Sequence, residues 1–238
     1  MADAATTANL LSSGYLSNIL NFLSAAAGLG TAAMGLVDSS KAFRGGPSNF
    51  GFGAIEKEVG PFLVAAAGGP TAFGRAEIVQ TLRANWLNGV PKADQKAKAK
   101  SLIHLGLTRG NAAALATPAG VDAATLTSLA QNTANGTAPT QQEINVLGQF
   151  DAIVSAVLDA AYERGDQQYR NACKVLGLAV STILGVFGGW IVYSSGFGIW
   201  QFWLSFLVGL SATPLAPVAK DLASSLQAAV TAVGAVKR

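Results

Sequence analysis

The chain has 238 residues, of which 50% are apolar and only 12% are charged. An ordinary soluble domain is about 25% charged, so the composition excludes a typical water-soluble protein and indicates that part of the chain is surrounded by lipid. The single cysteine, Cys173, excludes an intrachain disulfide and therefore a small secreted fold held together by disulfides.

The charged residues avoid two long stretches of the sequence. Residues 4–37 and 175–219 contain no Asp, Glu, Lys or Arg, although the whole chain has a formal net charge of +3. A transmembrane helix needs about 20 mainly apolar residues, so the second stretch, of about 45 residues, has room for two spans and a short turn. The sequence therefore predicts an all-α integral membrane protein with about three transmembrane helices.

Residues 1–40 are predicted to contain the first span, over about 16–37. Gly28, Ala32 and Gly35 recur at helical spacing and predict a face for close helix packing. The stretch from Gly28 also matches the G-x-G-x-x-A dinucleotide pattern, but that site requires a preceding strand, which this apolar helical run does not provide. Several Asn, Ser and Thr residues make the segment less apolar, so a re-entrant or interfacial helix is the alternative to a full span.

Residues 41–139 are predicted to form a small cytoplasmic helical region. Residues 41–49 contain Gly-Gly-Pro and indicate an irregular exit from the membrane, and we expect Phe50, Phe52 and Phe62 to lie near the bilayer surface.

Three helices are predicted in this region, over residues 72–87, 91–107 and 122–131. The first is indicated by Ile78, Leu82 and Trp86, which recur every four residues and form an apolar stripe.

The densest basic cluster lies in the second of these helices and consists of Lys92, Lys96, Lys98 and Lys100. Lysines near a membrane attract anionic lipid, and a solvated helix face is the simpler alternative. No aromatic residues alternate with the lysines, so nucleic acid is not an expected partner.

Residues 140–193 are predicted to form one long helix that enters the second span at 174–193. Thr140 and Glu143 have the spacing of a capping box, and no proline follows until Pro214. The predicted apolar face of this helix consists of Ile144, Leu147, Ile153 or Val154, Val157 or Leu158, and Ala161.

The third span is predicted over 197–214, so that residues 174–214 form a helical hairpin. Gly185 and Gly189 form a G-x-x-x-G pattern and predict close helix packing. The aromatic residues on either side of the turn are predicted to anchor it at the membrane–water interface, where aromatic side chains gather; they are Trp190, Tyr193, Trp200 and Trp203.

Beyond the prolines at 214 and 217, residues 216–234 are predicted to form an amphipathic helix. Val218, Leu222, Leu226, Val230 and Val233 align at spacings of three and four residues. We expect this helix to lie along the inner membrane surface, and packing against the cytoplasmic region is the alternative.

Positive charges beside the spans predict the orientation. Lys41 and Arg44 follow the first span, whereas Arg164, Arg170 and Lys174 precede the second. Basic flanks favour the cytoplasmic side, so the N-terminus is predicted outside and the central region and the C-terminus inside. The high Ala and Gly content favours a GC-rich bacterium, and hence its inner membrane.

The sequence contains no convincing catalytic, cofactor or metal site. His104 is the only histidine and has no partners at ligand spacing. Cys173, at the boundary of the second span, is expected to be a small buried residue, with palmitoylation as the alternative. The sequence therefore predicts a protein that is not an enzyme and binds no cofactor.

The predicted function is that of a structural or accessory membrane subunit that oligomerises or scaffolds a larger complex. Its expected partners are the lipid bilayer and either further copies of the chain or other membrane subunits. The alternative is a homo-oligomeric pore gated by hydrophobic constriction, because the spans contain no charged residues to line a channel.

Overall fold

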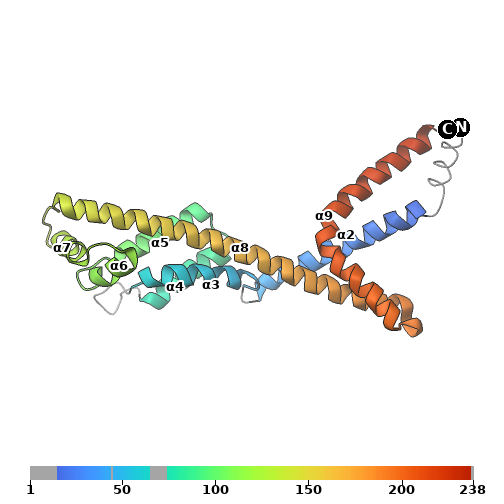
Figure 1. The fold of residues 1–238 in the computed structure, drawn as a ribbon, viewed down its shortest axis with the longest axis horizontal. Helices are drawn as coiled ribbons and strands as arrows, with labels where there is room; N and C mark the ends of the chain where they lie inside the picture. Colours follow the sequence, from blue (N-terminus) through green and yellow to red (C-terminus); the bar gives the residue numbers. More distant parts are fainter. Residues whose placement is uncertain (1–14, 44, 65–73, 237–238) are drawn as a thin grey trace. The chain divides into compact units, whose positions relative to one another are not determined.

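The computed structural model describes residues 15–43, 45–64 and 74–236, and this part of the chain contains helices and no strand. The α-helices, drawn in Figure 1, are α2 (Tyr15–Ser39), α3 (Ser48–Val59), α4 (Arg75–Leu87), α5 (Lys92–Leu105), α6 (Ala112–Ala119), α7 (Ala123–Ala134), α8 (Gln141–Tyr193) and α9 (Ile199–Val236). Short 3-10 helices cover Ser40–Ala42, Gly60–Phe62 and Ser194–Gly196.

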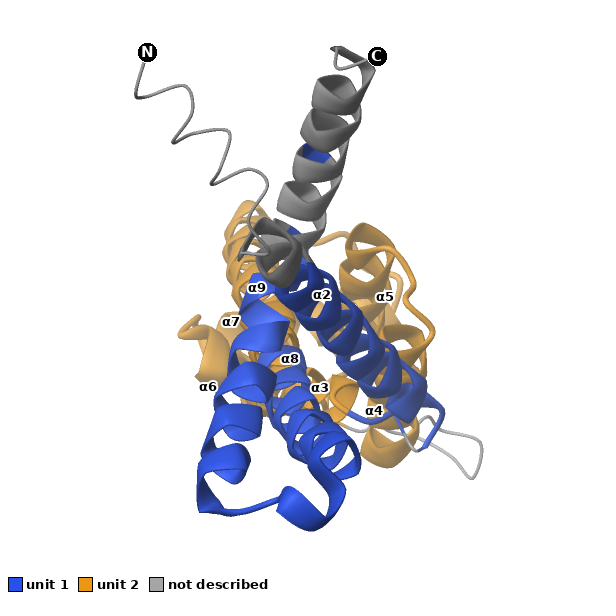
Figure 2. Cartoon of the chain, turned by 90° about the vertical axis from the view of Figure 1, so that its right-hand side faces the viewer, with its two compact units in different colours: residues 1–46, 172–238 blue, residues 47–171 orange. Residues whose placement is uncertain are grey.

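The chain divides into two compact units, which Figure 2 colours blue and orange. Unit 1 consists of residues 1–46 and 172–238, and unit 2 of residues 47–171. Helix α8 is one continuous helix of 53 residues and contributes to both units. The long helix that the sequence predicts over 140–193 is therefore present.

Unit 2 is built around a conventional hydrophobic core. Every helix from α3 to α8 contributes buried apolar side chains to it, among them Phe52, Ile55, Ile78, Leu82, Ile103, Leu115, Leu126, Phe150, Val154, Leu158 and Tyr162. Burying a side chain of this size stabilises a fold by about 1.5–3 kcal/mol. This burial is the main source of stability for unit 2.

Most of the predicted apolar face of α8 packs against this core. Val154, Leu158 and Ala161 are buried, and three further predicted residues are partly buried against the core, namely Leu147, Ile153 and Val157. The buried residues include Val146, Phe150, Val154 and Leu158, which follow one another every four residues. Ile144, which the prediction places on the buried face, is instead 47% exposed. The prediction also omitted Phe150, a large aromatic residue that is fully buried in this core.

The segment after the first predicted span is more regular than the sequence suggests. The irregular exit predicted over 41–49 overlaps only the first two residues of α3, and no element was predicted for the rest of this helix, Ser48–Val59. Phe52 and Phe62 belong to the core of unit 2, not to a bilayer surface, whereas Phe50 is exposed. Arg44 lies outside the described residues.

A close approach between α3 and α8 explains why glycine is used in α3. A Cβ atom on Gly51 would lie 2.6 Å from the carbonyl oxygen of Gly165, and one on Gly165 would lie 2.9 Å from the carbonyl oxygen of Gly51. Backbone atoms in a helix cannot move aside, so both positions require glycine. The tertiary contact offsets the cost of about 1 kcal/mol of placing glycine within a helix.

The C-terminal part of the chain forms one helix where the sequence predicts two elements. Helix α9 continues through Pro214 and Pro217 to Val236. Proline has a backbone angle compatible with a helix, and its missing N–H bends the helix without ending it. Figure 1 shows that α9 changes direction along its length. All five side chains of the predicted apolar stripe over 216–234 lie outside the part of the chain whose side chains the structure describes.

Residues 140–143 cap α8 as the sequence predicts. Glu143 Oε2 accepts a hydrogen bond of 2.8 Å from the Thr140 N–H, while Thr140 Oγ1 accepts one of 3.3 Å from the Glu143 N–H. Asn132 of α7 also donates to Glu143 Oε1, at 2.9 Å. Hydrogen bonds from Ser128 and from the Thr140 backbone lower the pKa of the buried Glu143 carboxyl group.

Replacing Phe150 by Ala should strongly weaken unit 2, because a fully buried aromatic ring would leave a cavity. We expect the free energy of opening to fall by about 3–5 kcal/mol, measured by hydrogen exchange of peptides from α3 to α8. Ile144→Ala changes a half-exposed residue of the same helix and should cost no more than about 0.5 kcal/mol. Equal effects of the two changes would contradict the observed face of α8.

Acidification should remove the contribution of Glu143 to stability. A carboxyl group whose pKa is lower in the folded state stabilises the fold above the ordinary glutamate pKa of about 4.3, and this contribution disappears as the pH falls through the folded value. Glu143→Gln should therefore lower the thermal unfolding midpoint at pH 7 more than at about pH 3.5.

The control is Glu163→Gln, the same change at an exposed position of α8. It should leave the unfolding midpoint nearly unchanged at both pH values. A loss of stability in Glu143→Gln that is independent of pH would show that the carboxylate is not the stabilising form.

Candidate functional site

Unit 1 contains three helices that are long and apolar enough to cross a membrane. The apolar stretches are Asn21–Ala42, the second half of α8, and Ile199–Pro217. Many of their large apolar side chains are exposed, with Ile183 68% and Ile199 78% accessible. Soluble monomers rarely expose contiguous apolar patches larger than a few hundred Å², so unit 1 differs in kind from the conventionally packed unit 2.

The hairpin formed by α8 and α9 depends on glycine. A Cβ atom on Gly185 would lie 2.7 Å from the Cα atom of Gly209, and one on Gly209 would lie 2.6 Å from the carbonyl oxygen of Ser181. Gly189 faces the side chain of Ser205. Gly185 and Gly189, which the sequence indicates as packing residues, therefore contact α9 within the same chain.

Hydroxyl groups connect the same two helices. Ser181 Oγ lies 2.8 Å from the Gly209 carbonyl oxygen, and Thr213 Oγ1 lies 3.0 Å from the Gly177 carbonyl oxygen and 2.8 Å from Ser181 Oγ. Each hydroxyl has one proton, so Thr213 donates to one of its two acceptors at a time. Such bonds between apolar helices are worth about 0.6 kcal/mol on average. The sequence analysis missed them, although Gly177, Ser181 and Gly185 follow at intervals of four.

Helix α2 packs against α9 through a different face from the predicted one. Ala26 and Ala33 are fully buried, and a Cβ atom on Gly30 would lie 2.6 Å from the Ala212 carbonyl oxygen. The predicted residues Gly28, Ala32 and Gly35 lie on the exposed side of α2, with open space around both glycines. These three residues can therefore pack only against a helix that is not part of the described chain.

The four predicted interfacial aromatics are all exposed. Trp190 and Tyr193 precede the turn at Ser194–Gly196, and Trp200 and Trp203 follow it, with exposed fractions between 42% for Tyr193 and 71% for Trp200. Their rings are available to a surrounding medium, as the anchoring role predicted from the sequence requires.

The basic cluster of α5 lies opposite acidic residues of α8. Lys92 contacts Asp166 at 2.9 Å, Lys96 contacts Asp159 at 2.5 Å, and Lys100 lies 3.5 Å from Asp151. We call these three pairs the α5–α8 charge ladder. Lys98 lies outside it and approaches Asn85 Oδ1 at 3.5 Å. Exposed pairs are each worth up to about 1 kcal/mol, and they reduce the charge that the lysines present to anionic lipid.

Asp166 is paired with two basic residues, Lys92 and Arg170. The hydrogen bond from Lys92 has the largest effect and, with that from Arg170, lowers the pKa of the Asp166 carboxyl group against the opposing effect of desolvation. Arg164 pairs with Glu58 of α3 instead. Asp166, Arg164 and Arg170 near the end of unit 2 are therefore each paired with an opposite charge within the chain.

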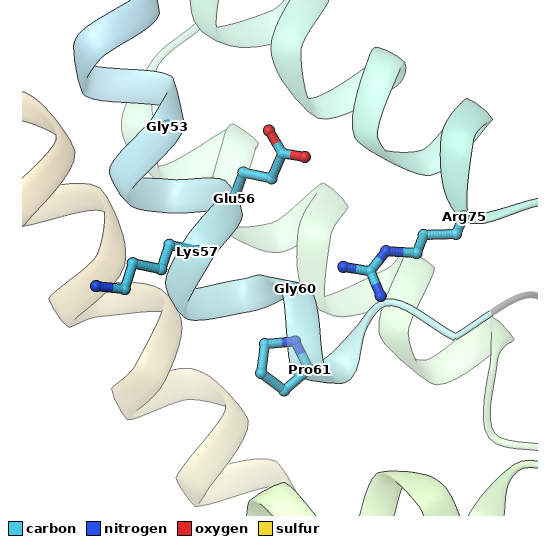
Figure 3. Close-up of a pocket in the computed structure, with 6 residues that line it drawn as sticks. All are labelled: Gly53, Glu56, Lys57, Gly60, Pro61 and Arg75. Carbon is cyan, nitrogen blue, oxygen red and sulfur yellow. The ribbon is translucent and has the colours of Figure 1, made fainter.

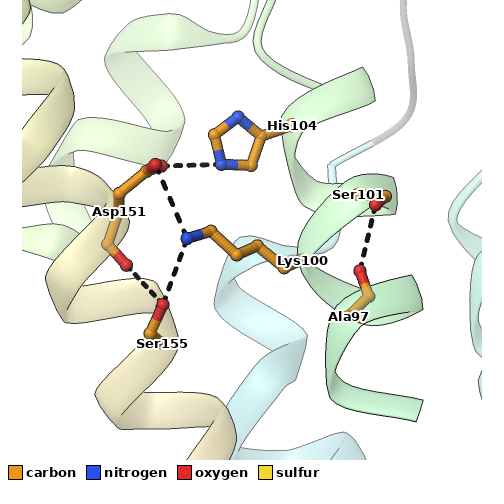
Figure 4. Close-up of polar contacts among 6 residues, drawn as sticks. All are labelled: Ala97, Lys100, Ser101, His104, Asp151 and Ser155. Atoms are coloured by element: carbon orange, nitrogen blue, oxygen red, sulfur yellow. Dashed lines mark hydrogen bonds and ion pairs between the residues drawn. The ribbon is translucent and has the colours of Figure 1, made fainter. Parts of the chain in front are cut away.

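His104 belongs to the same contact between α5 and α8, as Figure 4 shows. Its Nε2 atom lies 2.7 Å from Asp151 Oδ1. Lys100 Nζ lies 3.2 Å from Ser155 Oγ, and Ser155 itself donates to the Asp151 carbonyl oxygen at 2.7 Å. The serine proton is thus directed at the backbone and not at His104, so these residues do not form a nucleophile–base pair.

Tyr162 is the largest fully buried side chain of unit 2. Its ring lies 6.3 Å from that of Trp86, and its hydroxyl group has no hydrogen-bond partner among the described residues. Burial raises the pKa of the Tyr162 phenol to about 12. The phenol therefore stays neutral at physiological pH and serves as part of the core.

Figure 3 shows an open surface pocket of about 540 Å³ beside α3 and α4. Its lining includes Glu56, Lys57, Arg75 and the segment at Gly60 and Pro61. Glu56 and Arg75 point toward the same space, whereas Lys57 points away from it. Because the pocket is open and carries charges of both signs, its electrostatics favour no particular class of ligand.

The described residues contain no cluster of three or more His, Cys, Asp or Glu side chains arranged to hold a metal ion. Cys173 is a free, partly buried thiol. No protein-family model, curated protein or solved structure matches this chain.

Replacing Gly185 by Leu should separate α8 from α9, because the new side chain would collide with backbone atoms at Gly209. We expect a loss of about 1–3 kcal/mol or more, observed as a lower unfolding temperature in detergent. Gly188→Leu makes the same change three residues away, where no atom lies within 4 Å. An equally strong effect of Gly188→Leu would argue against the glycine contact as the cause.

Proposed function

We propose that the protein is a non-enzymatic structural subunit of a membrane, anchored by unit 1 and carrying unit 2 as a helical domain in the aqueous phase. The observation that carries this proposal is the exposure of large apolar side chains on all three long helices of unit 1. In hydrocarbon, exposed apolar side chains carry no free-energy penalty, and a helix satisfies its own backbone hydrogen bonds.

The distribution of charge supports the orientation proposed for the anchor. Residues 175–219 contain no charged side chain, and basic residues stand at the ends of the apolar stretches, including Lys41, Arg170 and Lys174. Basic flanks favour the cytoplasmic side. In our proposal unit 2 and the C-terminus lie in the cytoplasm of a bacterium, and the turn at Ser194–Gly196 faces outward across the inner membrane.

The exposed small face of α2 supports a role in assembly. Gly28, Ala32 and Gly35 are exposed, and a Cβ atom on either glycine would meet no atom within 4 Å, unlike the small residues that face α9. In lipid, small residues allow another helix to approach closely and gain van der Waals contact. We propose that this face binds α2 of a second copy of the chain.

A structural role also fits the way in which the polar groups of the spans are used. Ser181 and Thr213 are engaged in contacts between α8 and α9. They are therefore less suited to lining an aqueous path, which weighs against the alternative of a homo-oligomeric pore. Ion currents from the purified protein in a planar bilayer would reverse this preference.

The membrane anchor and the assembly face can be tested together. We expect the wild-type chain to remain in membranes washed with alkaline carbonate and to give dimers or larger species when cross-linked there. Leucine at both Gly28 and Ala32 should reduce cross-linking about tenfold, which corresponds to about 1.4 kcal/mol, without releasing the chain from the membrane.

The matched control is Gly188→Leu, which adds the same side chain to the outer surface of α8. It should leave cross-linking unchanged. Release of the wild-type chain by carbonate would overturn the membrane anchor, whereas wild-type cross-linking that yields only monomer would overturn the assembly role alone.

A further inference from the structure

A groove of about 810 Å³ lies on unit 1 between α2, α8 and α9. Its walls are mainly apolar and include Met34 of α2, Leu178 of α8 and Pro214 of α9. Gly30 also lines the groove, and it allows α2 to contact the backbone of α9 at Ala212. The groove is thus formed by the packing of all three candidate spans.

One cation lines this groove. Lys174 is the only charged residue among the lining side chains, and it directly precedes the uncharged stretch 175–219. No described carboxylate pairs with it, in contrast to Lys92, Lys96 and Lys100 of the charge ladder. The groove therefore combines an apolar surface with a single positive charge at one end of the uncharged stretch, which is complementary to a ligand with an anionic head and a hydrocarbon tail.

Two prolines, Pro214 and Pro217, line the groove on the side of α9. Pro214 and Pro217 have no N–H, so the carbonyl groups of Leu210 and Thr213 lose the partners that a regular helix would give them. In an apolar medium an unsatisfied carbonyl group is costly. A ligand whose head group carries hydroxyl donors would fit this part of the site.

We propose that the groove binds one anionic glycerophospholipid, with its phosphate group against Lys174 and an acyl chain along Met34 and Leu178. This inference rests on the proposed membrane location of unit 1. Phosphatidylglycerol matches the site best, because it has one negative charge and head-group hydroxyl donors. Phosphatidylethanolamine is the comparison lipid, since its phosphate charge is balanced by its own ammonium group.

The test is to reconstitute the full chain into phosphatidylcholine vesicles containing equal small amounts of phosphatidylglycerol and phosphatidylethanolamine. The protein is then extracted in mild detergent, and the lipids that remain bound are measured by mass spectrometry. We expect phosphatidylglycerol to be enriched over its share in the vesicles. Lys174→Gln should reduce this enrichment about five-fold, the factor expected from one basic residue near a lipid head group, whereas Lys174→Arg should retain it.

A second variant tests the apolar part of the groove. Thr31 lines it and is exposed, so Thr31→Trp should fill the space and displace the bound lipid with Lys174 intact. Leu207→Trp places the same side chain at a position of α9 that is 59% exposed and outside the groove, and it should leave lipid retention unchanged.

The outcomes separate this inference from the proposed function. Carbonate extraction of each variant reports whether the chain is still inserted in the membrane. An inserted wild-type chain that retains no excess phosphatidylglycerol, or a Lys174→Gln variant that retains as much as the wild type, overturns the lipid site alone. Equal retention of the two test lipids would overturn the preference for an anionic head group. A chain released by carbonate overturns the membrane anchor itself.

Discussion

The contact between the backbones of α8 and α9 at Gly185 and Gly209 determines how unit 1 is built. At this separation no side chain fits between the helices, so they are held by van der Waals contact along their backbones. The same closeness brings Ser181 within hydrogen-bond distance of the Gly209 carbonyl group. A larger residue at either glycine would remove both interactions together.

The two units use opposite packing rules. Unit 2 buries large side chains such as Phe150 and Tyr162 and places its charged pairs on the outside. Unit 1 places small residues inside and leaves large apolar ones exposed, as at Ile183 and Ile199. In water, large apolar residues gain most from burial. In hydrocarbon that gain is absent, so close contact between small residues becomes the favourable way to join helices.

Features that depend on local pattern could be predicted from the sequence, whereas features that depend on tertiary contacts could not. The length of α8 follows from its capping box and from the absence of proline before Pro214. Helix α3 was not predicted, and the need for glycine at Gly51 follows only from the contact of this residue with α8. The charge ladder could not be predicted, because the sequence does not show that α5 and α8 are neighbours.

The inner face of α2 illustrates a different limit. Small residues occur on all sides of this helix, so spacing alone favoured Gly28 and Ala32 as strongly as Gly30 and Ala33. Only the position of α9 distinguishes the two faces. Ser181 and Thr213 were missed for a related reason, since a hydroxyl group in an apolar helix can always bond to its own backbone.

The tryptophans are divided between the two units in a way that is useful for spectroscopy. Trp86 is the single tryptophan of unit 2, where it lies 6.3 Å from Tyr162 and 6.4 Å from Tyr169 and donates to the Ser48 carbonyl group. The other three, at 190, 200 and 203, belong to unit 1 and are exposed. Intrinsic fluorescence therefore contains two separable signals. Trp86 can be excited by energy transfer from its two neighbouring tyrosines, whereas the three tryptophans of unit 1 are accessible to quenchers dissolved in the surrounding medium.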